Sequence, residues 1–200
     1  MYFIKKLIKF SVIICISLGY MESSFSIGAD VFVQSTVNRA SEALGGTYTK
    51  EEKIEKLKNI ARETVDIKGI GLYTLGNHRK NISESQKMIY EPLFKEYFLK
   101  SFASRLAEYT NPEVRVDSSK KLNKNYTMVS SVLIATEQRP EIKIDWRIYT
   151  KNPENLLIRD LIIEGLSLAR TQKEEFNSII LNNDGNIDFL FVSLNKFINE

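Results

Sequence analysis

The chain has 200 residues, of which 43% are hydrophobic and 26% are charged. This length is typical of a single domain, and the hydrophobic fraction excludes global disorder because it supplies enough apolar surface for a core. The formal net charge of +3 is too small to indicate a nucleic-acid-binding protein.

The N-terminal residues have the order of a secretory signal peptide. Three lysines lie within the first nine residues, an apolar run extends from Phe10 to about Tyr20, and small residues follow as far as Ala29. The run is shorter than the about 20 residues that a membrane-spanning helix needs. We predict a signal peptide over residues 1–29, cleaved after Ser26 or Ala29, with an uncleaved anchor as the alternative.

Removal of residues 1–29 would change both the thiol content and the charge of the chain. The single cysteine, Cys15, lies in this segment, so a chain of residues 30–200 has no disulfide, thiolate metal site or cysteine nucleophile. That chain keeps 25 of the 28 basic and 24 of the 25 acidic residues. We therefore expect a nearly neutral, secreted monomer that does not bind nucleic acid.

Helical patterns dominate the first half of the remaining chain. Apolar residues at helical spacing predict a helix over Asp30–Leu44, which a glycine pair ends. The sequence from Thr49 to Glu52 has the pattern of a capping box, in which the first and fourth residues cap a helix start, and it begins a second helix to about Ala61. The stretch DIKGIGLYTLG, residues 66–76, predicts a short helix.

A long aromatic helix follows. Ser83 to Gln86 form another capping box, and aromatic residues at helical spacing continue to Tyr109. Pro92 either kinks this helix or marks the first turn of its main part.

The apolar period then changes from that of a helix to that of a strand. Strands are predicted over Val114–Asp117, Tyr126–Thr136, Glu141–Tyr149 and Leu156–Glu164, and helices over Leu168–Leu181 and Ile187–Phe197. The fourth strand is apolar on both faces, which indicates a central position. This order predicts an α+β fold. The N-terminal helices and the long helix would pack on a roughly four-stranded antiparallel sheet, followed by two C-terminal helices.

Few residues suggest catalysis. The single histidine, His78, lies in the loop GNHRKN, and no G-x-S-x-G nucleophile motif occurs. Asp160 and Glu164 lie four residues apart on a predicted strand, so they would share a face and could act as acid and base. An α+β cone-type enzyme that uses Asp160 or Glu164 as general base is therefore an alternative, against ion pairing and turn hydrogen bonds for the same residues. No metal-binding motif is predicted.

The segment IRDLIIEGLSL, residues 158–168, resembles the C-terminal signature of the MlaC family. Asp160, Glu164, Gly165, Ser167 and Leu168 match that signature in order. The stretch that begins at Asp66 and ends at Gly76 is similar to the family's aspartate-led helix, which ends in leucine-glycine. The stretch IKIDWRI, residues 142–148, is similar to one of its strands.

The resemblance implies that residues 30–200 form one MlaC-like lipid-binding domain with an apolar cavity between sheet and helices. Members of this family resemble periplasmic carriers that shuttle phospholipid between an outer-membrane lipoprotein complex and an inner-membrane ABC transporter complex. Such transport maintains the lipid asymmetry of the outer membrane. On this interpretation phospholipid is cargo, there is no cofactor, and the protein is not an enzyme.

Strand alternation and helical spacing select the residues that we expect to line the cavity. Gly165 would allow a sharp turn at the cavity edge, and Ser167 would cap the helix that follows. The expected lining residues are Phe98, Phe102, Met128, Val132, Ile134, Ile142, Ile144, Trp146, Ile148, Ile158 and Ile162.

Overall fold

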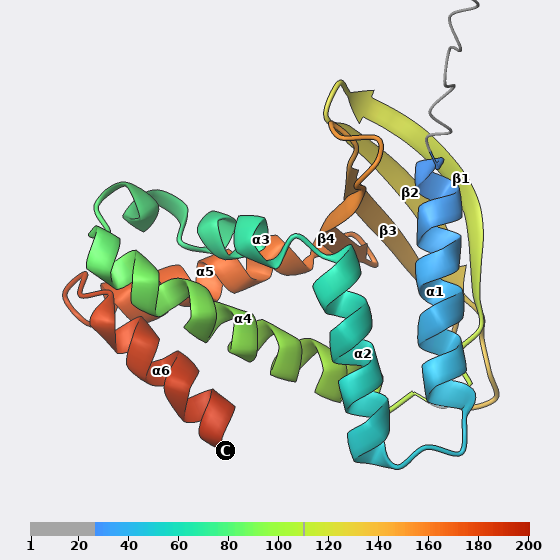
Figure 1. Ribbon diagram of the computed structural model, residues 1–200, viewed down its shortest axis with the longest axis horizontal. Coiled ribbons are helices and arrows are strands. Elements are labelled where there is room, and N and C mark those ends of the chain that lie inside the picture. Colours follow the sequence, from blue (N-terminus) through green and yellow to red (C-terminus); the bar gives the residue numbers. More distant parts are fainter. Residues whose placement is uncertain (1–26, 110) are drawn as a thin grey trace, which may run out of the picture.

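The computed structural model describes residues 27–109 and 111–200 (Figure 1). The helices are α1 (Ala29–Gly45), α2 (Lys50–Thr64), α3 (Ile67–Thr74), the 3-10 helix η1 (Gly76–Lys80), α4 (Glu84–Leu106), α5 (Leu168–Leu181) and α6 (Asp188–Asn199). The strands are β1 (Val114–Asn123), β2 (Tyr126–Leu133), β3 (Ile142–Tyr149), β4 (Leu157–Ile163) and β5 (Leu166–Ser167). The predicted α+β fold is confirmed. Most of the expected signal peptide, including Cys15, lies outside the described residues, so that expectation stays a prediction.

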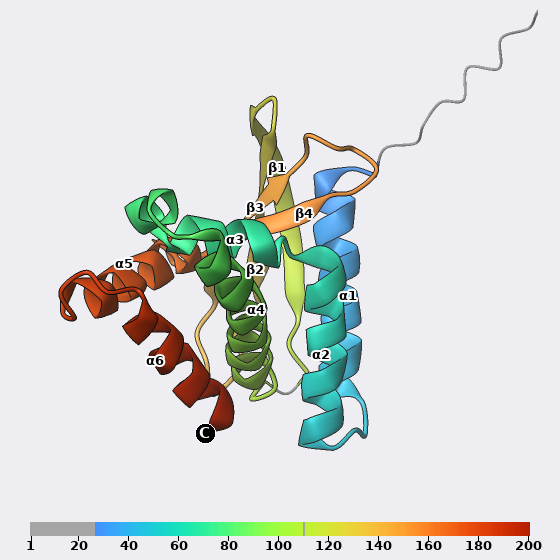
Figure 2. The same cartoon turned by 60° about the vertical axis from the view of Figure 1, so that its left-hand side comes forward.

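The five strands form one antiparallel sheet in the order β1-β2-β3-β4-β5. Four of them are the predicted strands, and the fifth is the two-residue strand β5. The pairing shifts register within β1 between Val116 and Ser118, and between β3 and β4 next to Arg147. Such irregularities bend a strand and increase its twist, in agreement with the curved sheet in Figure 2.

β1 and β4 differ most from the sequence prediction, and β2 ends at Leu133, three residues before the predicted Thr136. β1 continues six residues beyond Asp117 to Asn123, and in this extension Lys120 pairs with Met128 of β2. The extension is polar because β1 is an edge strand with a mostly exposed surface. It therefore lacks the alternation of apolar and polar residues by which a strand is predicted from sequence. β4 is also not central in the sheet. β5 pairs only with Ile162 and Ile163, and the connection between α2 and α3 lies beside Ile158, whose carbonyl accepts from the Asp66 amide (3.0 Å).

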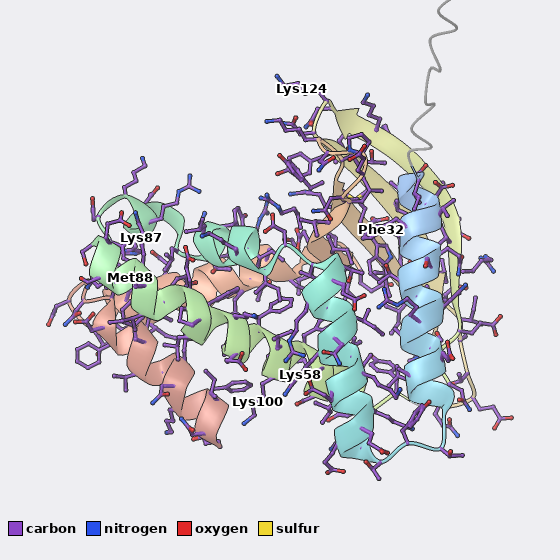
Figure 3. The ribbon with its side chains drawn as sticks, in the orientation of Figure 1. Phe32, Lys58, Lys87, Met88, Lys100 and Lys124 are labelled. Carbon is purple, nitrogen blue, oxygen red and sulfur yellow. The ribbon has the colours of Figure 1, made fainter. Side chains whose placement is uncertain are left out.

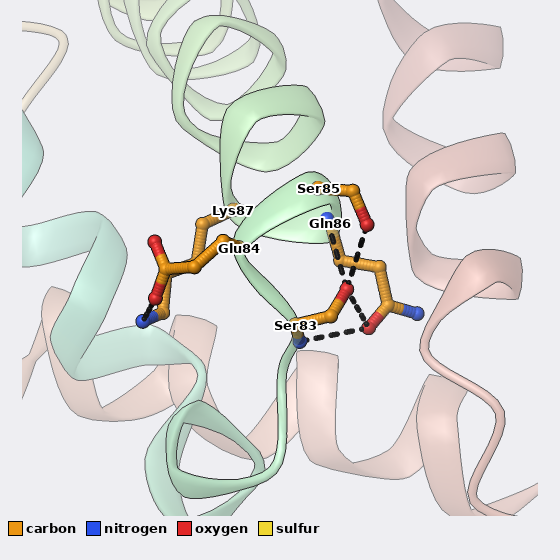
Figure 4. Close-up of polar contacts among 5 residues, drawn as sticks. All are labelled: Ser83, Glu84, Ser85, Gln86 and Lys87. Carbon is orange, nitrogen blue, oxygen red and sulfur yellow. Dashed lines mark hydrogen bonds and ion pairs between the residues drawn. The ribbon is translucent and has the colours of Figure 1, made fainter.

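The long helix α4 begins at the predicted capping box (Figure 4). The Ser83 hydroxyl accepts from the Gln86 amide (3.2 Å), and the Gln86 side-chain oxygen accepts from the Ser83 amide (3.1 Å). Lys87 forms an ion pair with Glu84 in the first turn (2.6 Å). Pro92 lies inside the continuous helix α4, so the alternative in which Pro92 marks the first turn of a separate main helix is wrong.

The helices divide into two groups around the sheet (Figures 1 and 2). α1 packs on β1 and β2, and α2 lies beside α1 and contacts α4. α3, α5 and α6 surround the N-terminal half of α4 at the other end of the molecule. Lys100 reaches from α4 to the C-terminal end of α6, where it donates to the carbonyls of Phe197 and Ile198 (both 3.0 Å) (Figure 3).

The second helix group has a dry core. Its largest fully buried side chains include Tyr90 and Phe94 of α4, Phe176 of α5 and Leu190 of α6. Gly71 of α3 allows the two helices α3 and α4 to approach, because a Cβ atom there would lie 2.7 Å from the Phe94 ring. This core holds the first half of α4 between α3 and α6.

Candidate functional site

An apolar cavity of about 390 Å³ lies between the sheet, α1, α2, the second half of α4 and the first half of α5. This volume is within the range of about 300–1,000 Å³ that small-molecule sites in proteins occupy. The side chains around it are mostly aliphatic and aromatic. An apolar molecule is therefore the ligand that this cavity fits best.

One aromatic face of α4 forms a wall of the cavity. Phe94, Phe98 and Phe102 lie on the cavity, and their spacing of four residues places them on the same helix face. Tyr109 lies three residues beyond the end of α4 and also lines the cavity. The rings of Phe98 and Phe102 stack with centroids 5.6 Å apart and an interplanar angle of 10°. The stacked rings of Phe98 and Phe102 present their apolar surface to the cavity, as we expected from their helical spacing in the sequence.

The sheet supplies the opposite wall. Ile144 pairs with Ile163 and Trp146 pairs with Leu161, and all four side chains line the cavity. Trp146 donates its ring hydrogen to the Ser131 hydroxyl (2.8 Å). The polar edge of the indole is thus satisfied inside the sheet, and the rest of its ring can contact an apolar ligand.

The sequence analysis did not assign α1 and α2 to the cavity. Val37 and Leu44 of α1 and Leu57 and Ala61 of α2 form its third wall, and all four are buried. The sequence does predict an apolar face for each of these two amphipathic helices. Nothing in that pattern distinguishes a helix face that covers a cavity from one that covers a solid core.

The structure separates the eleven expected lining residues into two sets. Phe98, Phe102, Ile142, Ile144, Trp146 and Ile158 line the cavity. Met128, Val132, Ile134, Ile148 and Ile162 do not contact it.

The placement of Met128 and Val132 on the cavity side is wrong because the expected face of β2 is reversed, and Ile134 lies one residue beyond the end of β2. The register pairs Met128 with Arg147, whereas Ser131 pairs with Ile144. Directly opposite residues in an antiparallel pair share a face, and alternate residues change face. Val129, Ser131 and Leu133 therefore share the cavity face of the sheet, and the even-numbered residues of β2 point away from it.

Ile162 and Ile148 are outside the cavity for different reasons. Ile162 pairs with Asp145 and so points to the same side of the sheet as Arg147. Ile148 shares the face of Trp146 but is completely buried in the dry core.

The comparisons with known proteins agree with this geometry. A family model described as MlaC protein matches residues 33–196. The chain belongs to the MlaC family. The fold is also similar to that of a solved phospholipid-binding protein from Ralstonia solanacearum in complex with a phospholipid. The two structures superpose with a TM-score of 0.72, and the match covers 86% of this chain and 98% of that chain. The sequences are 18% identical. At this identity the likeness shows a common fold.

The MlaC-type signature forms the turn between β4 and α5. Glu164 and Gly165 both have positive φ angles, of 49° and 81°, as a tight two-residue hairpin turn requires. Ser167 is the predicted helix cap, and its hydroxyl accepts from the Arg170 amide (3.1 Å). Glu164 is exposed and accepts from the Lys143 amide.

Asp160 is the buried polar centre of this turn. Its side chain is only 5% exposed, and it accepts hydrogen bonds from the Ser167 hydroxyl (2.6 Å) and the Ala169 amide (3.1 Å). Asp160 therefore connects the strand to the first turn of α5. Asp160 and Glu164 were expected on one strand face, but Glu164 lies in the turn beyond β4, and each carboxylate has separate hydrogen-bond partners.

The upstream family residues also organise helix ends. The Asp66 side chain accepts from the Gly69 amide at the start of α3 (2.8 Å) and forms an ion pair with Arg159 of β4. Gly76 has a φ angle of 55° where α3 gives way to η1. In this conformation a glycine is favoured because it has no Cβ atom.

A polar corner interrupts the apolar wall between α4 and α5. Tyr97 donates its hydroxyl hydrogen to Gln172 Oε1 (2.8 Å), and Gln172 donates to Glu175 Oε2 (2.9 Å). Burial raises the pKa of the Tyr97 hydroxyl, the negative charge of Glu175 raises it further, and the hydrogen bond to Gln172 and the positive charge of Arg105 lower it. All four residues line the cavity.

The described residues hold no group of three or more histidine, cysteine or acidic side chains that could bind a metal ion. Within the same residues no helix is both long enough and apolar enough to cross a membrane.

Proposed function

We propose that this MlaC-family chain is a periplasmic phospholipid carrier. It would take lipid between an outer-membrane lipoprotein complex and an inner-membrane ABC transporter complex, and so help to maintain outer-membrane lipid asymmetry. The observation that carries this proposal is the apolar cavity of about 390 Å³. The predicted signal peptide of residues 1–29 and the family membership of residues 33–196 support a periplasmic location.

The energetics of lipid transfer explain why a cavity of this kind is needed. Two acyl chains contain roughly thirty methylenes, and exposing them to water costs on the order of 25 kcal/mol. Spontaneous exchange between membranes is slow for this reason. A carrier must replace the membrane interior with apolar protein surface, as the aromatic face of α4 and the cavity face of the sheet can do.

The cavity residues then have defined roles in the proposed complex. Phe98 and Phe102 of α4 and Ile144 and Trp146 of β3 would contact the acyl chains. Phospholipid would be cargo, and no cofactor is required. We propose that the carrier works as a monomer.

The enzyme alternative has less support from the geometry. A general base needs a lone pair directed at its substrate. The two oxygens of Asp160 each accept a hydrogen bond that holds the start of α5. Glu164 is exposed at a turn and binds the Lys143 amide. The arrangement of both carboxylates therefore favours a structural role over catalysis.

Extraction of bound lipid tests the proposal. The protein is expressed with its N-terminal segment, purified from the periplasmic fraction without detergent and extracted with organic solvent. Mass spectrometry is expected to find phospholipid at close to one molecule per chain. Protein that is folded but free of phospholipid, or that is found only in the cytoplasm, would contradict the carrier function.

A further inference from the structure

The cavity wall contains three charged residues, Arg105, Asp160 and Glu175. The carboxylate of Asp160 is engaged by Ser167 and Ala169. Arg105 and Glu175 have no such structural duty, and both are exposed to solvent while they line the cavity. They therefore lie where the cavity meets water.

Arg105 is an exception on the apolar face of α4. It follows Phe98 by seven residues and Phe102 by three, so it projects from the helix face that lines the cavity. Among the residues that the structure describes, no carboxylate lies within 4.0 Å of its guanidinium, and it makes no hydrogen bond with another side chain. A guanidinium that is directed to a lipid cavity and has no acidic partner is available to bind an anion.

Glu175 of α5 also lines this cavity, and a chain of hydrogen bonds from α4 holds it in place. One of its oxygens accepts from Gln172, which in turn accepts from Tyr97. Tyr97 is anchored in its place by edge-to-face and tilted contacts with Phe197 and Phe176, with centroid distances of 5.0 and 5.8 Å. The second oxygen of Glu175 makes no hydrogen bond within the described part of the chain. The chain Tyr97–Gln172–Glu175 thus fixes a carboxylate at the cavity edge.

Arg105 and Glu175 line the same cavity as Tyr97, and both charges act on the hydroxyl group of Tyr97. Glu175 raises the pKa of Tyr97 and Arg105 lowers it, so both charges are near the Tyr97 hydroxyl. They do not form an ion pair with each other at 4.0 Å or less among the described contacts. Two opposite charges that line one cavity without pairing with each other suit a ligand that carries an anion and a cation of its own.

We propose that Arg105 and Glu175 form a headgroup site that selects zwitterionic phospholipids. Arg105 binds the phosphate, and Glu175 binds the ammonium group. This inference rests on the carrier function proposed above and adds a lipid class to it. The guanidinium offers two parallel N–H donors to phosphate oxygens. An anionic headgroup without an ammonium group gives Glu175 no cation to bind, and the Glu175 carboxylate repels it. The site therefore binds zwitterionic lipids more tightly than anionic ones.

Competition between two lipids tests the headgroup site. Delipidated protein is incubated with vesicles that contain equal amounts of phosphatidylethanolamine and phosphatidylglycerol, re-isolated, and its lipids quantified by mass spectrometry. The wild-type protein is expected to take up phosphatidylethanolamine in preference, by up to about fivefold, because exposed charge pairs contribute at most about 1 kcal/mol each.

Two variants separate the roles of the charges. Glu175→Gln is expected to abolish the preference without lowering the total load. Arg105→Gln is expected to lower the load of both lipids several-fold, because both carry a phosphate. The matched controls are Glu174→Gln, next to Glu175 but outside the cavity wall, and Arg79→Gln, exposed on η1. Both controls are expected to behave like the wild type.

The outcomes distinguish the headgroup site from the carrier function. If Glu175→Gln keeps the wild-type lipid ratio, or if folded Arg105→Gln keeps the wild-type load, the headgroup site is wrong although the protein still carries lipid. If the wild-type protein takes up neither lipid, the carrier function itself is wrong. Circular dichroism of each variant verifies that the fold is intact.

Discussion

Ile144 and Met128 lie on adjacent strands, and the pleat of the sheet places them in different surroundings. Ile144 of β3 lines the cavity opposite the aromatic face of α4. Met128 of β2 points to the other face, between Arg147 of β3 and Lys120 of β1 in the register of the sheet. A glutamate at position 144 should therefore reduce lipid binding, whereas a glutamate at position 128 should leave it unchanged.

We predict that Ile144→Glu lowers the amount of phospholipid that co-purifies with the protein by at least about tenfold. An unpaired carboxylate in an apolar cavity loses hydration that an acyl chain cannot replace. Met128→Glu is the control, because its carboxylate can pair with Lys120 and Arg147 and should leave the lipid load unchanged. Lipid extraction and mass spectrometry measure both variants. A folded Ile144→Glu variant with a full lipid load would remove Ile144 from the lipid site.

Ser167 has two hydrogen bonds at the turn between β4 and α5. Its hydroxyl accepts from the Arg170 amide and donates to the buried Asp160. We predict that Ser167→Ala lowers the free energy of unfolding by about 1–3 kcal/mol, because a helix cap is lost and a buried acceptor loses a donor. Ser178→Ala is the control, since that hydroxyl donates only to the Glu174 carbonyl on an exposed part of α5. Urea denaturation measures both, and equal effects would contradict the role of Ser167.

Local chemistry decided which residue roles were predictable. The turn at Gly165 and the cap at Ser167 depend on neighbours within a few positions, so the sequence predicted both. The cavity face of β2 was not predictable, because this strand has apolar residues at both parities, such as Met128 and Val129, and only the register with β3 selects between them. Arg105 was missed because a basic residue in the last turn of a helix usually complements the helix dipole.

At the scale of elements, α4 belongs to both halves of the molecule. Its first half packs through Tyr90 into the dry core, its second half presents Phe98 and Phe102 to the cavity, and Phe94 contacts both. Pro92 lies in the first half, between Tyr90 and Phe94, and is exposed. Proline has no amide hydrogen and its ring crowds the carbonyl four residues earlier, here that of Met88, so α4 lacks one backbone hydrogen bond at this point.

We predict that Pro92→Ala raises the free energy of unfolding by about 1–3 kcal/mol, because alanine restores the hydrogen bond to Met88 and is the best helix former. Glu96→Ala, at another exposed position of α4, is the control and should change stability by only a few tenths of a kcal/mol. Urea denaturation measures the two variants. No gain for Pro92→Ala would mean that the packing of Tyr90 and Phe94 requires a bend that only proline supplies.

Element type was easier to predict than element partner. Capping boxes and glycine stops predicted the ends of α1, α2 and α4 to within a few residues, because these signals are local. The contact of α1 with β1 and β2, which makes α1 a wall of the cavity, depends on residues more than 70 positions apart, such as Ser41 and Pro112. The periodicity of apolar residues along the sequence does not show which distant elements pack against each other.

At the scale of the whole molecule, a dry core and a hollow region lie next to each other. The core of α3, α4, α5 and α6 has fully buried side chains such as Phe176 and Leu190. The hollow region is bounded by α1, α2, the sheet, the second half of α4 and the first half of α5. A carrier must remain folded both with and without cargo, and the dry core can stabilise the fold while the cavity is empty.

We predict that removal of bound lipid lowers the thermal midpoint of unfolding without unfolding the protein at room temperature. A ligand at a free concentration of about 100 times its dissociation constant stabilises the folded state by about 2.7 kcal/mol. In a domain of this size that free energy corresponds to about 5–10 °C. Calorimetry before delipidation, after it, and after reloading from phosphatidylethanolamine vesicles measures the effect. Ile144→Glu is the control, because a protein that cannot load lipid should show one midpoint in all three samples. If the wild-type midpoint is also independent of lipid, the acyl chains do not occupy the cavity between α4 and the sheet.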